Sequence, residues 1–310
     1  MKLLCKILLA FAFAFTVGNG NALFAQFGGG NGTYANPYQI KTRQHLELLA
    51  DSVNNGNNWS KNKYFKVMND ITDTVRTVIG RTETNNSGYE RFFQGHFDGQ
   101  NHKIVLGIIN NSSNNVGLFG CIYSDDNSVI TISNVTVEGY VKSLDSGWCV
   151  AGIVAFSSIE IMGKQNGIIV IKNCINNCDV TNTNSLPDDF YVSMTGGIIG
   201  FQEIHGNIEN CINNGKIIGD GVLGGISGRS ILMGKIVNCT NTGEISSISS
   251  RKSIVTAVGG ILGDDAFGII ENCINSGRIS GDSLVGGISG CSRYSKITNC
   301  INIGTVKEIL

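Results

Sequence analysis

A ten-residue phrase that returns along the second half of the chain constrains the fold more than any other feature. It reads Ile-Glu-Asn-Cys-Ile-Asn-Asn-Gly-Lys-Ile from Ile208, and related copies begin at Ile236, Ile270 and Ile297, with a looser copy at Ile171. The unit from Ile208 to Ile236 is 28 residues long, and the unit from Ile270 to Ile297 is 27. A unit of this length is typical of repeat architectures, in which each unit buries its apolar face only against its neighbours.

A second phrase, Gly-Gly-Ile-x-Gly, lies between the copies and begins at Gly196, Gly224, Gly259 and Gly286. Glycines in such columns predict either tight corners with positive φ or a close approach between neighbouring coils. The longer units carry extra polar residues at 181–191 and 246–255, which indicate loops that leave an otherwise regular coil.

The recurring positions alternate with a period of two, which indicates β-strands rather than helices. Recurring residues from Cys211 to Gly219 share one parity, whereas Ile208 and Asn210 fall on the other. The switch predicts a corner between Asn210 and Cys211. A stack of such strand–corner–strand coils is a parallel β-solenoid, so the expected fold class is all-β.

Equivalent positions of stacked coils should form ladders along the axis. The expected ladder residues are Asn210, Cys211, Asn238, Cys239, Asn272, Cys273, Asn299 and Cys300. We expect the asparagines to bond from amide to amide or to satisfy backbone groups at the corner.

The cysteine column has three interpretations. Val135 occupies the cysteine position in an upstream copy, Ile132–Val141, which favours a small buried apolar slot filled by reduced thiols. Disulfides between coils are the second interpretation, since neighbouring coils bring Cα atoms close enough. Metal ligation is the third, although the sequence lacks a matching cluster of cysteine and histidine.

The chain divides into a leader at 1–25, a cap with the first coils at 26–110, and repeats at 111–310. A basic start at Met1–Lys6, an apolar run at Ile7–Val17 and a small-residue end at Ala22–Ala25 form the pattern of a secretory signal peptide. The predicted location is therefore extracellular, at the outer surface or in the periplasm. No later segment is apolar enough to span a bilayer.

The net charge of −1, from 23 basic and 24 acidic residues, gives no electrostatic basis for nucleic-acid binding. Ahead of the repeats, apolar residues at helical spacing predict a short helix between Thr42 as N-cap and Gly56 as stop: Leu46, Leu49, Ala50 and Val53. With strands at 64–68 and 103–109, this segment should cover the first coil.

Several motifs in this order resemble the GLUG-motif surface proteins of Bacteroidetes. The motifs are Gly28–Thr33, Asn36–Ile40, Phe97–Ile104 and Val116–Gly120, and the last contains Gly117, Leu118, Phe119 and Gly120. The resemblance implies a right-handed parallel β-helix related to the pectin-lyase fold, exported and adhesin-like, without implying an activity. Relatives also accompany large bacterial proteases as accessory segments. No sorting segment follows before Leu310, which leaves surface attachment open.

A catalytic β-helix would need clustered carboxylates or Ca²⁺ ligands and a basic side chain on the coil exterior. The candidates with the best claim to a ligand or Ca²⁺ are Asp188, Asp189, Asp264 and Asp265. Asp264 and Asp265 are expected at a corner after Gly263, in a column whose other members are not acidic. Asp98-Gly99 is interpreted as a tight turn. We predict no catalytic residue, metal or cofactor.

The sequence therefore favours a non-catalytic exported β-helix that serves adhesion or surface scaffolding through loops on the coil exterior. Glycans or host or microbial surface proteins are the expected partners. The alternatives are a polysaccharide lyase or glycosidase, and an accessory module of a larger secreted system. The last coil has no evident cap, so end-to-end self-association at the C-terminal coil is also expected.

Overall fold

The computed structural model describes residues 27–81, 91–110, 114–125, 127–144, 147–159, 167–183, 192–203, 205–248 and 256–309. The predicted leader and the acidic pair Asp188 and Asp189 lie outside these residues. The described chain forms one α-helix and 33 strands in four parallel sheets, here called A to D. It is a right-handed parallel β-helix, as predicted.

Each sheet collects one strand position from successive coils. Sheet A contains, in spatial order, β1 (Tyr38–Ile40), β2 (Tyr64–Val67), β4 (His96–Asp98), β8 (Val129–Ser133), β12 (Ile168–Lys172), β16 (Gly206–Glu209), β21 (Lys235–Val237), β26 (Ile269–Glu271) and β31 (Lys296–Thr298). Sheet D contains β6 (Asn115–Val116), β10 (Cys149–Ala151), β14 (Met194–Gly196), β19 (Val222–Gly224), β24 (Ala257–Gly259) and β29 (Leu284–Gly286). Sheet C contains β7 (Phe119–Ser124), β11 (Val154–Ile159), β15 (Ile199–Gln202), β20 (Ser227–Ile231), β25 (Leu262–Ala266) and β30 (Ser289–Arg293).

Sheet B changes character along the stack. It begins with the strands β3 (Ile71–Val75), β5 (Lys103–Asn110), β9 (Thr136–Ser143) and β13 (Ile175–Asn182). After β13 each coil has two short strands in place of one, in the rows β17 (Ile212–Asn213), β22 (Thr240–Asn241), β27 (Ile274–Asn275), β32 (Ile301–Asn302) and β18 (Ile217–Gly219), β23 (Ile245–Ser247), β28 (Ile279–Gly281), β33 (Val306–Glu308).

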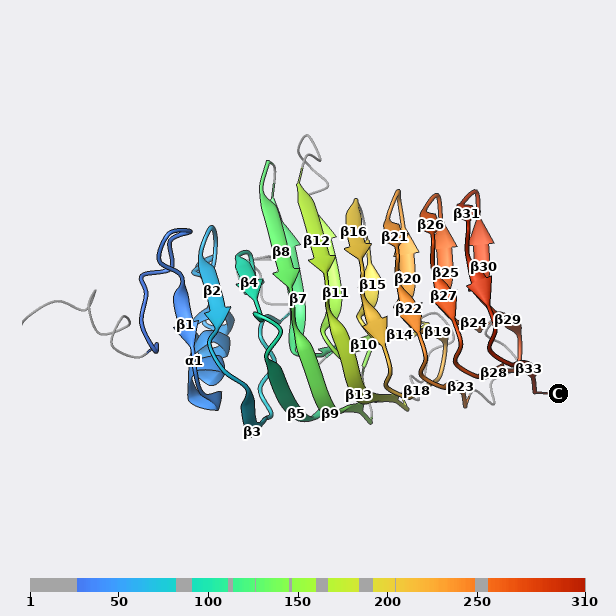
Figure 1. Cartoon of the computed structure of the whole chain (residues 1–310), viewed down its shortest axis with the longest axis horizontal. Coiled ribbons are helices and arrows are strands. Elements are labelled where there is room, and N and C mark those ends of the chain that lie inside the picture. The colour runs from blue at the N-terminus through green and yellow to red at the C-terminus, as the bar shows by residue number, and fades with distance from the viewer. Residues whose placement is uncertain are drawn as a thin grey trace, which may run out of the picture.

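From β4 onward the chain runs through sheets A, B, D and C in each coil before it re-enters sheet A (Figure 1). The expectation of two strands in each unit was therefore too simple. The phrase Gly-Gly-Ile-x-Gly forms a second corner, with a strand of sheet D before it and a strand of sheet C after it.

Asparagines make the corner between sheets A and B. Their φ angles lie between 52° and 55° in every copy: Asn134, Asn173, Asn210, Asn238, Asn272 and Asn299. Apart from glycine, asparagine is among the residues that tolerate this left-handed conformation best. The corner predicted between Asn210 and Cys211 is confirmed.

The glycines of the second corner do not adopt positive φ; they permit close contact. A Cβ atom on Gly197 would lie 2.4 Å from the carbonyl oxygen of Gly225 and 2.3 Å from Oδ1 of Asn213. Of the two interpretations of these glycines, close approach is the one that the structure bears out.

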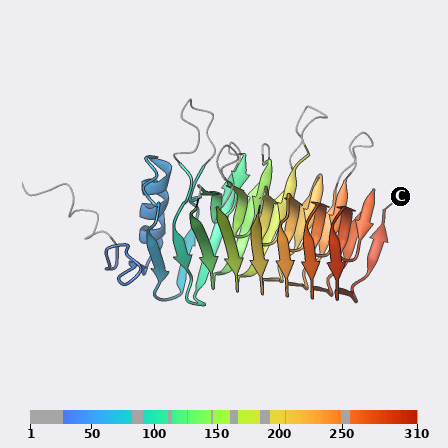
Figure 2. The same ribbon diagram turned by 90° about the horizontal axis from the view of Figure 1, so that it is seen from above.

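A helix closes the N-terminal end of the stack (Figures 1 and 2). Helix α1 (Arg43–Asn54) begins after Thr42, whose side chain accepts a hydrogen bond from the backbone N–H of His45. The predicted apolar residues are its buried face. No helix within the described ranges has the length and apolar character needed to cross a membrane.

Candidate functional site

The most regular polar feature of the interior is a second asparagine ladder that sequence reasoning missed. It consists of Asn176, Asn213, Asn241, Asn275 and Asn302, of which the first four are fully buried. Each Nδ2 donates to Oδ1 of the next asparagine at 2.7 Å. Each also donates to the carbonyl oxygen two residues ahead at 3.0 Å. The second asparagine of the phrase Asn-Cys-x-Asn was the available signal.

This inner ladder packs against the second glycine of the Gly-Gly-Ile phrase. A Cβ atom on Gly152 would lie 2.1 Å from Oδ1 of Asn176, and one on Gly225 would lie 2.4 Å from Cγ of Asn241. The two recurrent phrases thus touch each other inside the coil. The inner asparagines and these glycines therefore serve to stack the coils.

The predicted outer ladder lies at the exposed A–B corner. Asn238 donates to Asn210, and Asn210 to Asn173, both at 3.3 Å. Asn173 donates to Asn134 at 3.1 Å, and Asn134 to the Asp98 carboxylate at 2.8 Å. The column therefore begins at an acidic side chain that also accepts a hydrogen bond from the backbone N–H of Gln100, as expected of a turn.

The cysteine column consists of free thiols. The Cys211 thiol donates to the Glu209 carbonyl oxygen at 3.3 Å, and the backbone N–H of Cys211 points to Sγ of Cys239 at 3.4 Å. Burial raises the pKa of the Cys211 thiol well above its usual range. No group of three or more metal-ligating side chains occurs among the described residues.

Asp264 lies in the middle of strand β25, not at a corner as expected, because β25 runs on to Ala266. Its carboxylate is nearly buried between two arginines from adjacent coils. Nε of Arg229 is 3.1 Å from one oxygen, and Nη2 of Arg293 is 2.9 Å from both. The structure thus brings together a charged cluster, Arg229–Asp264–Arg293, on the outer face of sheet C.

Asp265 points to the opposite side of the strand and is 1% exposed. Burial raises the pKa of this carboxyl group. Polar groups of Ser295, Ala266 and Gly268 lie near the Asp265 carboxyl group and partly offset this rise in its pKa. None of the described residues forms a hydrogen bond of good geometry with either oxygen of Asp265. The pair Asp264 and Asp265 therefore does not form one site.

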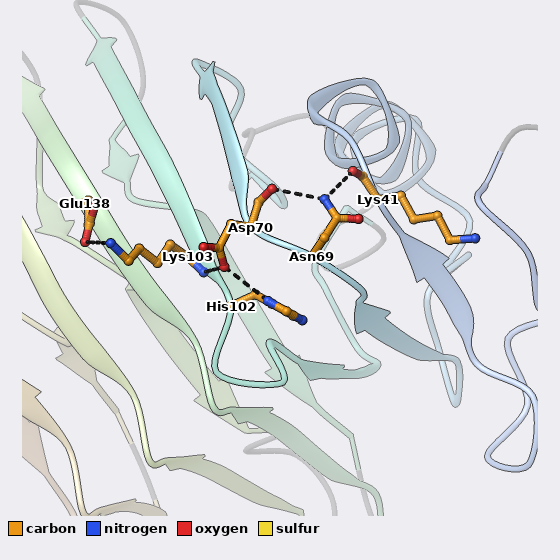
Figure 3. Close-up of polar contacts among 6 residues, drawn as sticks. All are labelled: Lys41, Asn69, Asp70, His102, Lys103 and Glu138. Carbon is orange, nitrogen blue, oxygen red and sulfur yellow. Dashed lines mark hydrogen bonds and ion pairs between the residues drawn. The ribbon is translucent and has the colours of Figure 1, made fainter.

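A second polar network lies on the exterior of the first coils (Figure 3). Asp70 accepts hydrogen bonds from the backbone N–H of Lys103 at 3.0 Å and from the ring of His102 at 3.1 Å. These bonds lower the pKa of the Asp70 carboxyl group. Lys103 in turn lies 3.1 Å from Glu138, so the network is a chain of exposed pairs.

The four histidines are dispersed over different elements. His96 stacks on Tyr64 with ring centroids 4.3 Å apart, and His45 accepts a hydrogen bond from the backbone of Lys41 at 3.0 Å. His205 lies at the corner between sheets C and A.

Bulky apolar side chains form an exposed ridge at the corner between sheets C and A. Its members, Leu232, Met233, Phe267 and Tyr294, are 46%, 63%, 52% and 86% exposed. Their φ angles are 58°, 71°, 64° and 58°, in the region that disfavours large side chains. The rings of Phe267 and Tyr294 stack at 5.1 Å with an interplanar angle of 10°. This corner ridge was not predicted; its signal was a bulky apolar residue directly after each of the last three strands of sheet C, β20, β25 and β30.

Comparison with known proteins supports the fold and leaves the family open. No family model matches the chain. A crystal structure from Bacteroides ovatus, described as "a putative immunoglobulin A1 protease", superposes with a TM-score of 0.65 at 23% identity over 89% of this chain and 77% of that one. A protein of Evansella cellulosilytica described as "Putative Gly-rich membrane protein" is 30% identical over 146 residues, or 44% of this chain. The match spans 15% of that longer protein.

Proposed function

We propose that the chain is a non-catalytic exported β-solenoid of the GLUG-motif type, and that its coil exterior serves adhesion or surface scaffolding. The observation that carries this proposal is the corner ridge. Exposed apolar side chains gain little from folding, and positive φ at non-glycine residues costs about 1–2 kcal/mol each. A contact surface accounts for both features together.

The proposed partners are glycans or surface proteins that present apolar faces. The ridge runs along the axis over three successive coils, since Leu232, Phe267 and Tyr294 follow strands β20, β25 and β30. A partner with a repeating apolar face could contact several coils at once, and linked contacts strengthen weak single ones. Arg293, which precedes Tyr294 in the sequence, adds a positive charge beside the corner ridge.

The basic and apolar leader supports export as part of the proposal. The accessory role remains compatible with it, because the similar stretch in the Evansella protein is a small part of a longer chain. In that case the solenoid would hold another domain at a distance from the surface, and the ridge would contact the same kind of partner.

The test is a binding array of glycans and surface proteins probed with the mature chain. The variant Phe267→Asn with Tyr294→Asn should lose binding while folding at least as well, because asparagine tolerates positive φ better than aromatic residues. Ile248→Ser, at an exposed position outside the ridge, is the matched control. Equal binding by all three proteins would contradict the proposal.

A carbohydrate-active β-helix is the second candidate, and the Arg229–Asp264–Arg293 cluster favours it. Two guanidinium groups on an outer face suit an anionic polysaccharide, since arginine binds carboxylates bidentately. Both guanidinium groups already contact Asp264, so this carboxylate would compete with the carboxylates of a polysaccharide for them. The test is to incubate the protein with polysaccharides that contain uronate and to measure the size of the polysaccharide and the ultraviolet absorbance of the products. Cleavage that disappears in Arg293→Gln but persists in Arg278→Gln would establish it and overturn the non-catalytic proposal.

A further inference from the structure

A row of charged side chains with alternating sign crosses four successive coils on the outer face of sheet B. This charge row is Asp179, Lys216, Glu244 and Arg278, each directly before a residue of one in-register column of the sheet. Neighbouring members belong to coils about 4.8 Å apart. Along the axis the charges therefore read negative, positive, negative, positive.

Within one copy of the chain, only the two central charges compensate each other. Nζ of Lys216 lies 3.3 Å from the Glu244 carboxylate. Asp179 accepts a hydrogen bond from the backbone N–H of Lys216 at 3.1 Å, but no described cation forms an ion pair with it. Arg278 likewise forms no ion pair with a described residue, and both end residues are exposed. The row thus ends in an unpaired negative charge on one side and an unpaired positive charge on the other.

A row with this order of charges is complementary to its own reverse. A two-fold axis that runs along the strands, between Lys216 and Glu244, turns the row of a second copy end for end. It places Asp179 opposite Arg278 of the second copy and Lys216 opposite its Glu244, so all four facing pairs have opposite signs. A two-fold axis along the stack would instead bring each charge against the same charge. Complementary potentials select between such arrangements, so the row favours the antiparallel one.

The row of polar residues beside the charges fits the same axis. It consists of Asn177, Asn214, Thr242 and Ser276, all exposed and all neutral. Asn214 donates to Asn177 at 2.8 Å, and Thr242 donates to Asn214 at 2.8 Å. The axis places Asn177 opposite Ser276 and Asn214 opposite Thr242. No charge is therefore brought against an uncharged apolar side chain in this row.

The complementarity is confined to these four coils. Tyr140 precedes Asp179 in the register of the row, and Thr305 follows Arg278, so the row is neutral beyond its ends. On the far side of the charges, Lys142 would face Lys307 of the second copy, which limits the contact to the coils between them.

We propose that a second copy of this chain docks antiparallel on the charge row, through a lateral two-fold contact between the two B sheets. Sheets that pack face to face lie about 10 Å apart, a separation that pairs of long charged side chains can bridge. The contact leaves the corner ridge exposed, because the ridge lies between sheets C and A. It therefore goes beyond the proposed function and does not rest on it.

The ionic character of the contact gives it a measurable signature. Exposed ion pairs contribute little individually and are screened by salt, so the association is weak and depends on ionic strength. The experiment is sedimentation velocity of the mature chain over a concentration series in about 0.01 M and about 1 M NaCl, where the Debye lengths are about 30 and 3 Å. A dimer that weakens in the higher salt is expected. A monomer throughout, or a dimer that salt does not weaken, would overturn the proposal.

Charge reversal tests the pairing itself. Asp179→Arg and Arg278→Glu each bring two pairs of like charges together, and each should weaken the dimer at least about tenfold. An equimolar mixture of the two variants should dimerise again, because every facing pair in a mixed dimer has opposite signs. Lys235→Glu, which reverses an exposed charge on sheet A, is the matched control and should dimerise like the wild type.

Thermal melting of each variant separates loss of pairing from loss of folding. No recovery in the mixture of folded variants, or equal weakening by Lys235→Glu, would overturn the proposal. The ridge variant Phe267→Asn with Tyr294→Asn should still dimerise. Loss of the dimer in that variant would place the contact at the corner ridge instead, so this proposal and the proposed function can fail separately.

Discussion

At the scale of single residues, the inner ladder explains why asparagine and glycine recur at fixed positions of the repeat. An asparagine side chain offers two N–H donors and one acceptor oxygen, and Asn241 uses them all. The adjacent glycine leaves the space that the amide requires. Alanine at Gly225 or leucine at Asn241 would break the same contact from opposite sides.

Replacing Asn241 with alanine should lower the free energy of unfolding by about 3 kcal/mol or more. The change leaves the Gly243 carbonyl, the Asn275 oxygen and an Asn213 N–H buried without partners, at about 1–3 kcal/mol each. Urea denaturation measures the effect. Asn214→Ala, which removes an exposed amide of the preceding coil, should cost under about 1 kcal/mol; equal losses would refute the special role of the inner ladder.

The cysteine column behaves as packing rather than as chemistry. Cys239→Val should change the free energy of unfolding by less than about 1.5 kcal/mol, because it is nearly isosteric and valine already fills this column at Val135. Denaturation with and without reductant measures it. A much larger loss, or a wild-type midpoint that falls on reduction, would show that the thiol column does more than fill space.

At the scale of elements, α1 is the part that makes the stack finite at one end. Thr42 caps the N-terminus of α1. The apolar face of the helix covers the first coil, as a neighbouring coil does elsewhere in the stack. The asparagine corner and the glycine corner set the path of each coil in different ways, one by backbone conformation and the other by the space it leaves.

Leu49→Ala should destabilise the cap by about 2–5 kcal/mol, since Leu49 is fully buried. Thr42→Ala should cost about 1 kcal/mol through loss of the N-cap. Hydrogen exchange should show faster exchange in α1 and β3 than in β21 or β26, because coils stabilise only their neighbours. Uniformly faster exchange along the whole stack would contradict this local effect.

At the scale of the molecule, the buried thiols should make the protein less stable as the pH becomes alkaline. Burial raises the pKa of Cys149 and Cys211 above the unfolded value of about 8.5. Their contribution is therefore complete below that pH and is lost as pH rises above it. The free energy of unfolding should fall by about 1.4 kcal/mol per pH unit for each such thiol. Urea midpoints from pH 7 to 10 measure this, and the double variant Cys211→Val, Cys239→Val should flatten the slope; an unchanged slope would exclude the thiols as its cause.

The sequence was enough to predict the solenoid, the A–B corner and α1, because each depends on local periodicity or capping. It did not predict that Asp264 lies between Arg229 and Arg293, since those residues are 35 and 29 positions away and meet only through the register of stacked coils. The corner ridge was not predicted for the same reason, because Phe267 and Tyr294 come into contact only when their coils stack.

The inner ladder has one more consequence. Each rung bonds to the rung above in the way it bonds to the rung below, at 2.7 Å from Asn176 to Asn302. The contacts within such a ladder therefore do not determine how many coils it contains. Duplication or loss of one whole unit would restore every contact and change only the reach, by about 4.8 Å. A lineage could therefore adjust how far this rod extends without altering what either end presents.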